Sequence, residues 1–137
     1  MRKTLLILAL AFFSWASDGM WSNYVQGFQK AAATGAGMFV IVGSKTCPFC
    51  KKLKKEIEES PYLRKKMGIF IPVYVDKESD FIPVDLLEKS ENVPAVFVVA
   101  KNNEIIGGPI YGYRTSSEMA RIIDAMKSEF FEKSKAH

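Results

Sequence analysis

The sequence predicts one α/β domain built around a mixed β-sheet. Three observations favour this class. Segments with helical spacing alternate with short β-branched apolar segments along the chain. Residues 38–42 (MFVIV) form a continuous apolar run, which is typical of a strand buried on both faces. A strand–helix–strand order then favours parallel pairing through a right-handed crossover, and a later hairpin adds antiparallel strands.

The first expected helix carries four apolar residues at helical spacing, namely Trp21, Tyr24, Val25 and Phe28. Ser17 or Asp18 can cap its start, and Gly35 and Gly37 end it. The buried strand 38–42 follows. A second helix then opens at Cys47 to Cys50, and its apolar side is formed by Phe49, Leu53 and Ile57.

A third, short helix is expected from Ser60 as N-cap and Pro61 at the first helical position. The next strand spans residues 69–75 and contains Pro72, which cannot donate a hydrogen bond to a neighbouring strand. We therefore expect this strand to lie at an edge of the sheet or to carry a bulge. Residues 83–88 can form another short helix.

The C-terminal part is predicted to contain a hairpin and a long helix. Residues 95–100 form a strand, residues 101–103 a tight turn, and residues 104–106 the returning strand. Thr115 and Glu118 then fit a capping box. The helix that this box opens has one apolar stripe, made of Met119, Ile122, Ile123, Met126 and Phe130.

The first sixteen residues have the layout of a secretory signal peptide. Arg2 and Lys3 are followed by nine apolar residues at 5–13 and then by small residues where a signal peptidase cleaves. This run is too short to cross a bilayer, which takes about 20 apolar residues. We therefore expect residues 1–16 to be removed on export to the periplasm, leaving residues 17–137 as one domain without a membrane span.

Composition excludes several kinds of chemistry. The chain has two cysteines and one histidine, the terminal His137, which are too few for a multi-disulfide scaffold or a four-ligand Cys/His zinc site. A catalytic His would have to come from the chain terminus, where order is poor. Loss of Arg2 and Lys3 with the signal leaves 17 basic against 15 acidic residues, so charge does not favour nucleic-acid binding.

The motif Cys-Pro-Phe-Cys therefore carries the expected chemistry. Cys47 stands at a helix start, where unpaired N–H groups and the helix dipole favour a thiolate, and Pro48 suits the first helical position. Nearby Lys45 and Lys51 add positive potential that lowers a thiol pKa. We assign Cys47 as the attacking thiolate and Cys50 as the thiol that resolves the mixed disulfide. No cofactor beyond this pair and no metal is expected.

Other uses of the two cysteines remain open at this stage. Two thiolates can bind one copper(I) ion, as in a copper-handling chaperone. A structural disulfide would close only a two-residue loop and add little stability. The domain could also be a redox-inactive binding module that uses the Val93–Pro94 loop.

The chain resembles the thioredoxin superfamily over residues 18–131. Four segments carry the resemblance: the strand MFVIV together with the CPFC motif that follows it, then IFIPVYVD, NVPAVF and GPIYGYRTSSE. The resemblance implies a thioredoxin-like fold, with helices on both faces of the sheet, and thiol-disulfide oxidoreductase activity. It implies that Pro94 is cis and packs beside the cysteine pair, where the backbone of Val93 can pair with an extended substrate segment. Thr46, Pro48 and Phe49 would complete the active-site surface.

The motifs also depart from thioredoxins proper. Thr46 replaces a tryptophan, and Ile41 stands where those proteins carry a buried acid, for which Glu56 is the candidate substitute. Cys-Pro-Phe-Cys is closer to the glutaredoxin pattern. The resemblance is best matched by a small exported protein, expected to be monomeric, that reduces or exchanges disulfides of periplasmic proteins. A membrane-bound thiol electron donor would keep it reduced, although the direction of electron flow stays open.

Overall fold

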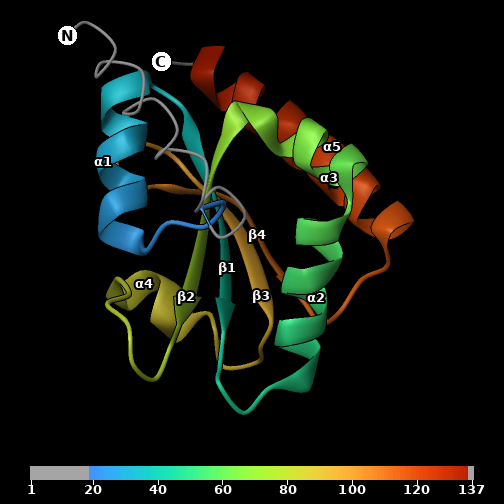
Figure 1. Ribbon diagram of the computed structural model, residues 1–137. Helices are drawn as coiled ribbons and strands as arrows, with labels where there is room; N and C mark the ends of the chain where they lie inside the picture. Colours follow the sequence, from blue (N-terminus) through green and yellow to red (C-terminus); the bar gives the residue numbers. More distant parts are fainter. Residues whose placement is uncertain (1–18, 136–137) are drawn as a thin grey trace, which may run out of the picture.

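The computed structural model describes residues 19–135 and shows a mixed β-sheet covered by helices on both faces (Figure 1). Residues 1–18 and 136–137 lie outside this range, so the expected signal peptide is not tested. The expected caps Ser17 and Asp18 also lie outside it, and the expectation that one of them caps the first helix was wrong, because Asn23 caps that helix. Within residues 19–135 the sheet has four strands in the order β2-β1-β3-β4. Their bounds are Gly37–Gly43 for β1, Phe70–Asp76 for β2, Ala95–Val99 for β3 and Ile105–Tyr111 for β4. The predicted α/β class is confirmed.

The strand pairing follows the expected pattern. β1 pairs in parallel with β2 and antiparallel with β3, and β3 pairs antiparallel with β4. Pro72 lies in β2, which is an edge strand of this sheet, so the missing N–H removes no hydrogen bond within it. On the open side of β2, Ser22 forms a single bridge to Val73.

The helices divide between the two faces of the sheet. One face is covered by α1 (Tyr24–Thr34) and α4 (Val84–Glu88), and the other by α2 (Pro48–Glu59), α3 (Pro61–Lys66) and α5 (Ser116–Lys135), as Figure 1 shows. A short 3₁₀ helix, η3 (Met67–Ile69), leads from α3 into β2. No helix within residues 19–135 has both the length and the apolar character needed to cross a membrane.

Two apolar cores explain why β1 is a continuous apolar run. Phe39 and Ile41 pack in the core beneath α2, α3 and α5, whereas Met38, Val40 and Val42 pack in the core beneath α1 and α4. All seven β1 residues are buried. Burial on both faces removes the need for alternating polar residues, so the run of apolar side chains is the direct sequence signal of a central strand.

The first helix begins later than the sequence predicts. Asn23 is its N-cap, and the Asn23 side chain accepts a hydrogen bond from the Gln26 backbone N–H. Trp21 therefore lies outside the helix, and its Nε1 donates to Glu58 of α2 at 2.7 Å. The expectation that Trp21 belongs to the helical stripe was wrong, because a long-range partner on α2 determines its position.

The returning strand of the hairpin is longer than the expected residues 104–106. β4 continues through Gly107, Gly108 and Pro109 to Tyr111, with register shifts opposite Val96 to Val99. Glycines and proline in this segment suggested a turn rather than a strand. Their role is local, because the irregular pairing with β3 and a positive φ of 88° at Gly108 accommodate them within the strand. The Gly108–Pro109 bond is cis.

Candidate active site

The two cysteines lie at the junction between the end of β1 and the start of α2. Cys47 is the N-cap of α2, and its Sγ accepts a hydrogen bond from the Cys50 backbone N–H at 3.1 Å. The two residues form a disulfide, with Cα atoms 5.3 Å apart. Cys47 is partly exposed and Cys50 is fully buried. The geometry therefore gives the two sulfurs unequal access to a partner molecule, in the order that the sequence predicts.

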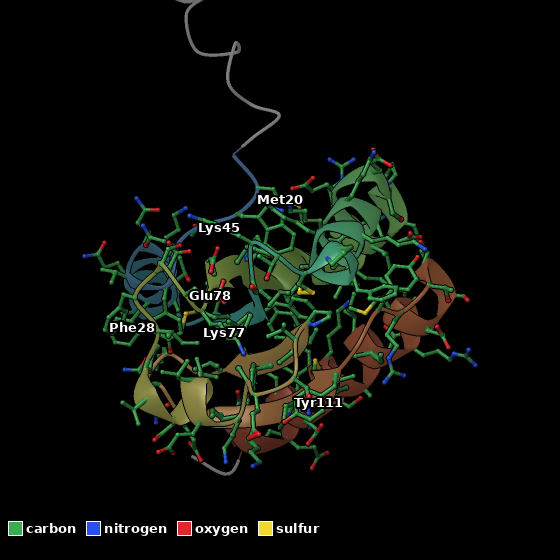
Figure 2. All side chains as sticks on the ribbon, turned by 90° about the horizontal axis from the view of Figure 1, so that it is seen from below. Met20, Phe28, Lys45, Lys77, Glu78 and Tyr111 are labelled. Carbon is green, nitrogen blue, oxygen red and sulfur yellow. A yellow bond between two sulfur atoms is a disulfide. The ribbon has the colours of Figure 1, made fainter. Side chains whose placement is uncertain are left out.

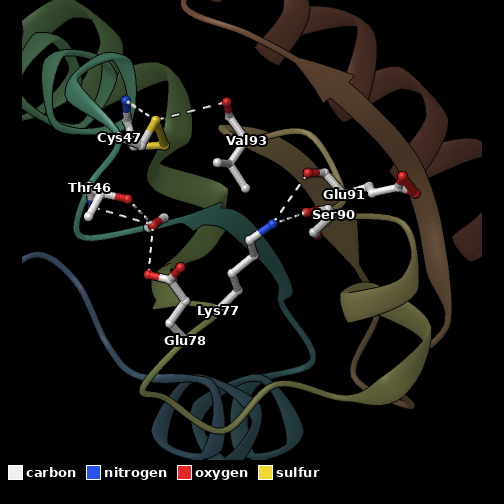
Figure 3. Close-up of a disulfide and its surroundings, with 9 residues drawn as sticks. Thr46, Cys47, Lys77, Glu78, Ser90, Glu91 and Val93 are labelled. Carbon is white, nitrogen blue, oxygen red and sulfur yellow. Dashed lines mark hydrogen bonds between the residues drawn. A yellow bond between two sulfur atoms is a disulfide. The ribbon is translucent and has the colours of Figure 1, made fainter.

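The loop before β3 is brought against this pair. The carbonyl oxygen of Val93 lies 3.9 Å from Cys47 Sγ, and the Val93–Pro94 bond is cis, in agreement with the expectation from the sequence (Figure 3). A sulfur in a disulfide carries no proton, so in the oxidised protein this is a contact and not a hydrogen bond. Pro94 is buried and Val93 is half-buried, so part of Val93 remains accessible beside Cys47.

The remaining predicted site residues lie on the rim. Thr46, Pro48 and Phe49 are exposed, and Phe49 keeps 60% of its surface accessible. Thr46 contacts Ser44 through their hydroxyl oxygens at 3.2 Å. These side chains are not needed to fill the core, so they are available to a docking partner. An exposed aromatic ring next to a cysteine is suited to contact an apolar substrate side chain.

The sequence prediction missed the polar residues that follow β2. The Lys77 ammonium donates to the backbone carbonyls of Ser90 at 3.0 Å and Glu91 at 3.3 Å, and so joins the end of β2 to the segment before Val93 (Figure 3). Ser44, buried beside the cysteine loop, donates to Glu78 at 2.8 Å. Figure 2 views this end of the molecule from below, with Lys77 and Glu78 labelled.

The position of Lys77 and Glu78 just after the second predicted strand could have indicated that they lie near the cysteine motif. β1 and β2 are parallel, so their carboxyl ends meet at one edge of the sheet. Residues that directly follow the second strand therefore lie near the motif that follows the first. The backbone confirms this proximity, because Lys77 N–H donates to the Gly43 carbonyl at 2.9 Å.

Lys77→Met should loosen the loop before Val93. The variant keeps most of the side-chain length but loses both charge-assisted hydrogen bonds, and we expect a loss of about 1 kcal/mol in the free energy of unfolding, because the site is partly exposed. Hydrogen exchange of residues 90–93 should become faster. Lys89→Met, at an exposed position of the same region, is the matched control. Equal exchange rates in the two variants would contradict a role for Lys77 in holding the loop.

An apolar side chain, that of Ile41, stands where thioredoxins proper carry a buried acid. Ile41 is fully buried in the core with Leu53 and Ile57 of α2. The candidate substitute Glu56 is occupied elsewhere, since Ser116 Oγ and Tyr113 Oη both donate to its carboxylate. These two hydrogen bonds, that of Ser116 first, hold the pKa of Glu56 below its ordinary value. The expectation that Glu56 serves the buried thiol was therefore wrong, because its carboxylate ties α2 to the start of α5.

No group of three or more His, Cys, Asp or Glu side chains that could hold a metal ion is found within residues 19–135.

A family model of the thioredoxin-like domain matches residues 24–127, which include the cysteine pair, Val93 and the sheet. The chain belongs to the thioredoxin-like family.

The chain is also similar to other known proteins. An uncharacterised protein of Archaeoglobus fulgidus is 33% identical over an alignment of 86 residues, which covers 58% of this chain and 65% of that protein. The chain thus spans just under two thirds of the length of this relative. A thioredoxin of Thermus thermophilus superposes with a TM-score of 0.64 at 19% identity, covering 77% of this chain and 85% of the thioredoxin. DsbH oxidoreductase superposes with a TM-score of 0.56 at 16% identity, covering 78% of this chain and 83% of the DsbH chain. At these identities the solved structures show a shared fold.

Proposed function

We propose that this protein is an exported thiol-disulfide oxidoreductase that works through the Cys47–Cys50 pair. One observation carries the proposal. The partly exposed Cys47 sulfur sits at the N-terminus of α2 and accepts the Cys50 N–H at 3.1 Å, while Cys50 is fully buried. In the reduced protein the same N–H and the helix dipole would stabilise a Cys47 thiolate, which is the reactive form of a cysteine.

The reaction would run through a mixed disulfide. The Cys47 thiolate attacks one sulfur of a substrate disulfide, a new S–S bond forms between Cys47 and the substrate, and the second substrate sulfur leaves as a thiolate that takes up a proton. The Cys50 thiol then loses its proton and attacks Cys47. The mixed disulfide breaks, and the substrate departs as a dithiol. Two electrons have moved to the substrate, and Cys47 and Cys50 are oxidised.

The substrates proposed are disulfides of exported proteins. The Val93 carbonyl lies 3.9 Å from the Cys47 sulfur, so an extended peptide lying along this loop would place its disulfide next to Cys47. The exposed Phe49 ring, two residues after Cys47, is also accessible to a substrate. A thiol electron donor in the membrane would return the pair to the dithiol, and the cysteine pair itself would be the redox group. We propose the periplasm as the location, from the signal-like residues 1–16.

Reduction of insulin by dithiothreitol tests the activity. The wild-type protein at micromolar concentration should shorten the time before insulin precipitates, and titration against glutathione buffers should give its reduction potential. A value near about −270 mV would indicate a reductant, and one near about −120 mV an oxidant. No acceleration and no reversible titration of the pair would contradict the proposal. Copper retained at one ion per chain by such an inactive protein would favour the copper chaperone instead.

A further inference from the structure

Tyr74 of β2 lies beside the position where the buried acid is missing. In the parallel pairing of β1 and β2, Ile41 is the register partner of Tyr74. Side chains at paired positions of neighbouring strands project to the same face of a sheet. Tyr74 packs against the same core as Ile41, on the side covered by α2. A polar group from the neighbouring strand therefore lies on the face that carries Cys50.

The Tyr74 hydroxyl approaches Cys50 through the space above Gly43. A Cβ atom placed on Gly43 would overlap the Tyr74 hydroxyl oxygen and would lie 3.1 Å from the Cβ of Cys50. The tyrosine hydroxyl and the Cys50 side chain are thus both neighbours of the space where a Gly43 side chain would lie. Because Gly43 has no side chain, this space is left open to the tyrosine hydroxyl.

Within residues 19–135, the Tyr74 hydroxyl has no hydrogen-bond partner, whereas the hydroxyls of Tyr24, Tyr111 and Tyr113 donate to other residues. The Tyr74 ring is fixed by an edge contact with Trp21 at 6.0 Å between centroids, and by the Lys54 ammonium 4.8 Å from the ring centroid. A disulfide sulfur is a weak acceptor, but a thiolate is a strong one.

Tyr74 also stays protonated while Cys50 ionises. Burial is the main cause that raises the pKa of Tyr74 above its ordinary value, and the charges of Asp76 and Glu58 raise it further. The hydroxyl can therefore donate a hydrogen bond but does not act as a base at neutral pH. The charged groups around it are Lys54 and Glu58 on α2 and Asp76 on β2.

We propose that Tyr74 is a positioning residue whose hydroxyl donates a hydrogen bond to the Cys50 sulfur once the pair is reduced, so that it stabilises the Cys50 thiolate in place of a buried acid. This inference rests on the proposed function. In the resolving step, the Cys50 thiol releases its proton to water, and the thiolate attacks Cys47 as described above. The Tyr74 hydroxyl keeps its own proton and supplies only the hydrogen bond.

The ionisation of Cys50 tests this assignment without any assay of activity. In a Cys47→Ser background, Cys50 is the only cysteine left. The pH dependence of its alkylation rate by iodoacetamide, measured without denaturant, reports the pKa of the Cys50 thiol. Adding Tyr74→Phe removes one oxygen atom and should raise this pKa by about one unit, a tenfold change in the ionisation constant. Lys54, Glu58 and Asp76 are present in both proteins, so their charges do not account for the difference.

Tyr24→Phe is the matched control. Tyr24 is a buried tyrosine on α1, its hydroxyl donates to Asn103, and burial raises its pKa to about 12. It packs in the core on the other face of the sheet, so this variant should leave the pKa of Cys50 unchanged. An equal shift in both variants would mean a general loss of packing and would overturn the proposal, as would no shift in Tyr74→Phe.

Activity measurements separate this inference from the proposed function. In the two-cysteine protein, Tyr74→Phe should slow the release of a substrate from its mixed disulfide about tenfold, while the initial attack by Cys47 keeps its rate. If the wild type has no reductase activity but the Cys50 pKa still responds to Tyr74→Phe, the proposed function fails and the Tyr74 contact stands. If the wild type is active and the Cys50 pKa does not respond, the role of Tyr74 is refuted.

Discussion

Cys47→Ser should reduce the rate of insulin reduction to that of the uncatalysed reaction, whereas Cys50→Ser should keep the initial attack on the substrate and accumulate a mixed disulfide. The reason is the unequal exposure of the two sulfurs, since Cys47 is partly exposed and Cys50 is fully buried. A serine hydroxyl is not ionised at neutral pH and is a weak nucleophile without a base. With Cys50 absent, the Cys47–substrate bond has no internal thiol to break it.

The experiment combines turnover with mass spectrometry of the trapped species. Each variant is incubated with a peptide that carries one disulfide, quenched with acid, and weighed. The Cys50→Ser protein should gain the mass of one whole peptide, whose second cysteine is then a free thiol, and the double variant Cys47→Ser/Cys50→Ser should gain none. Adduct formation in Cys47→Ser at the rate seen in Cys50→Ser would reverse the assigned roles. Equal turnover by all variants would refute the oxidoreductase function.

Gly108→Ala should cause the largest loss of stability among the glycine variants of β4 and the turn after it. Gly108 has a φ of 88°, which a residue with a Cβ atom rarely adopts, and that Cβ would overlap the backbone carbonyl oxygen of Val96. The left-handed conformation alone costs about 1–2 kcal/mol. The clash is with main chain in β3, which cannot move aside as a flexible side chain can. We expect a total loss of about 3 kcal/mol or more in the free energy of unfolding.

Gly112→Ala isolates the conformational part of this cost. Gly112 has a φ of 91°, but its Cβ would meet no atom within 4 Å. This variant should lose only about 1 kcal/mol. Urea denaturation of both variants gives the comparison. Equal losses would show that β3 does not press against Gly108, and a Gly108→Ala protein that fails to fold would agree with the larger cost when Gly112→Ala folds.

Features that depend on neighbouring residues could be predicted from the sequence. The capping box at Thr115 and Glu118 forms as expected, with Thr115 N–H donating to Glu118 at 3.0 Å. Ser60 caps α3 by accepting the Leu63 N–H, and Pro61 follows it. The position of Cys47 at a helix start belongs to the same class. Each of these needs only a few consecutive residues, so the local pattern contains the necessary information.

Features that depend on contacts between distant segments could not be predicted. Trp21 was assigned to a helix because its spacing fits, yet its partner Glu58 lies 37 residues away. The sequence predicts that the returning strand ends at residue 106, because glycine and proline after it favour a turn. Pairing with β3 instead holds the segment as a strand up to Tyr111. Glu56 is the sequence's candidate substitute for the buried acid, but the donors Tyr113 and Ser116 hold its carboxylate near the start of α5.

The sequence by itself determined that this protein places two cysteines at the start of a helix, directly after a strand buried on both faces. That arrangement follows from local backbone chemistry and from a run of apolar residues. Only the tertiary structure decided which polar side chains lie around the pair and the loop before Val93. Lys77 reaches the loop before Val93, and the Tyr74 hydroxyl and Cys50 both lie next to Gly43, because the parallel register of β1 and β2 brings these segments together. Register is set by the packing of the whole sheet, so no single segment of the sequence contains it.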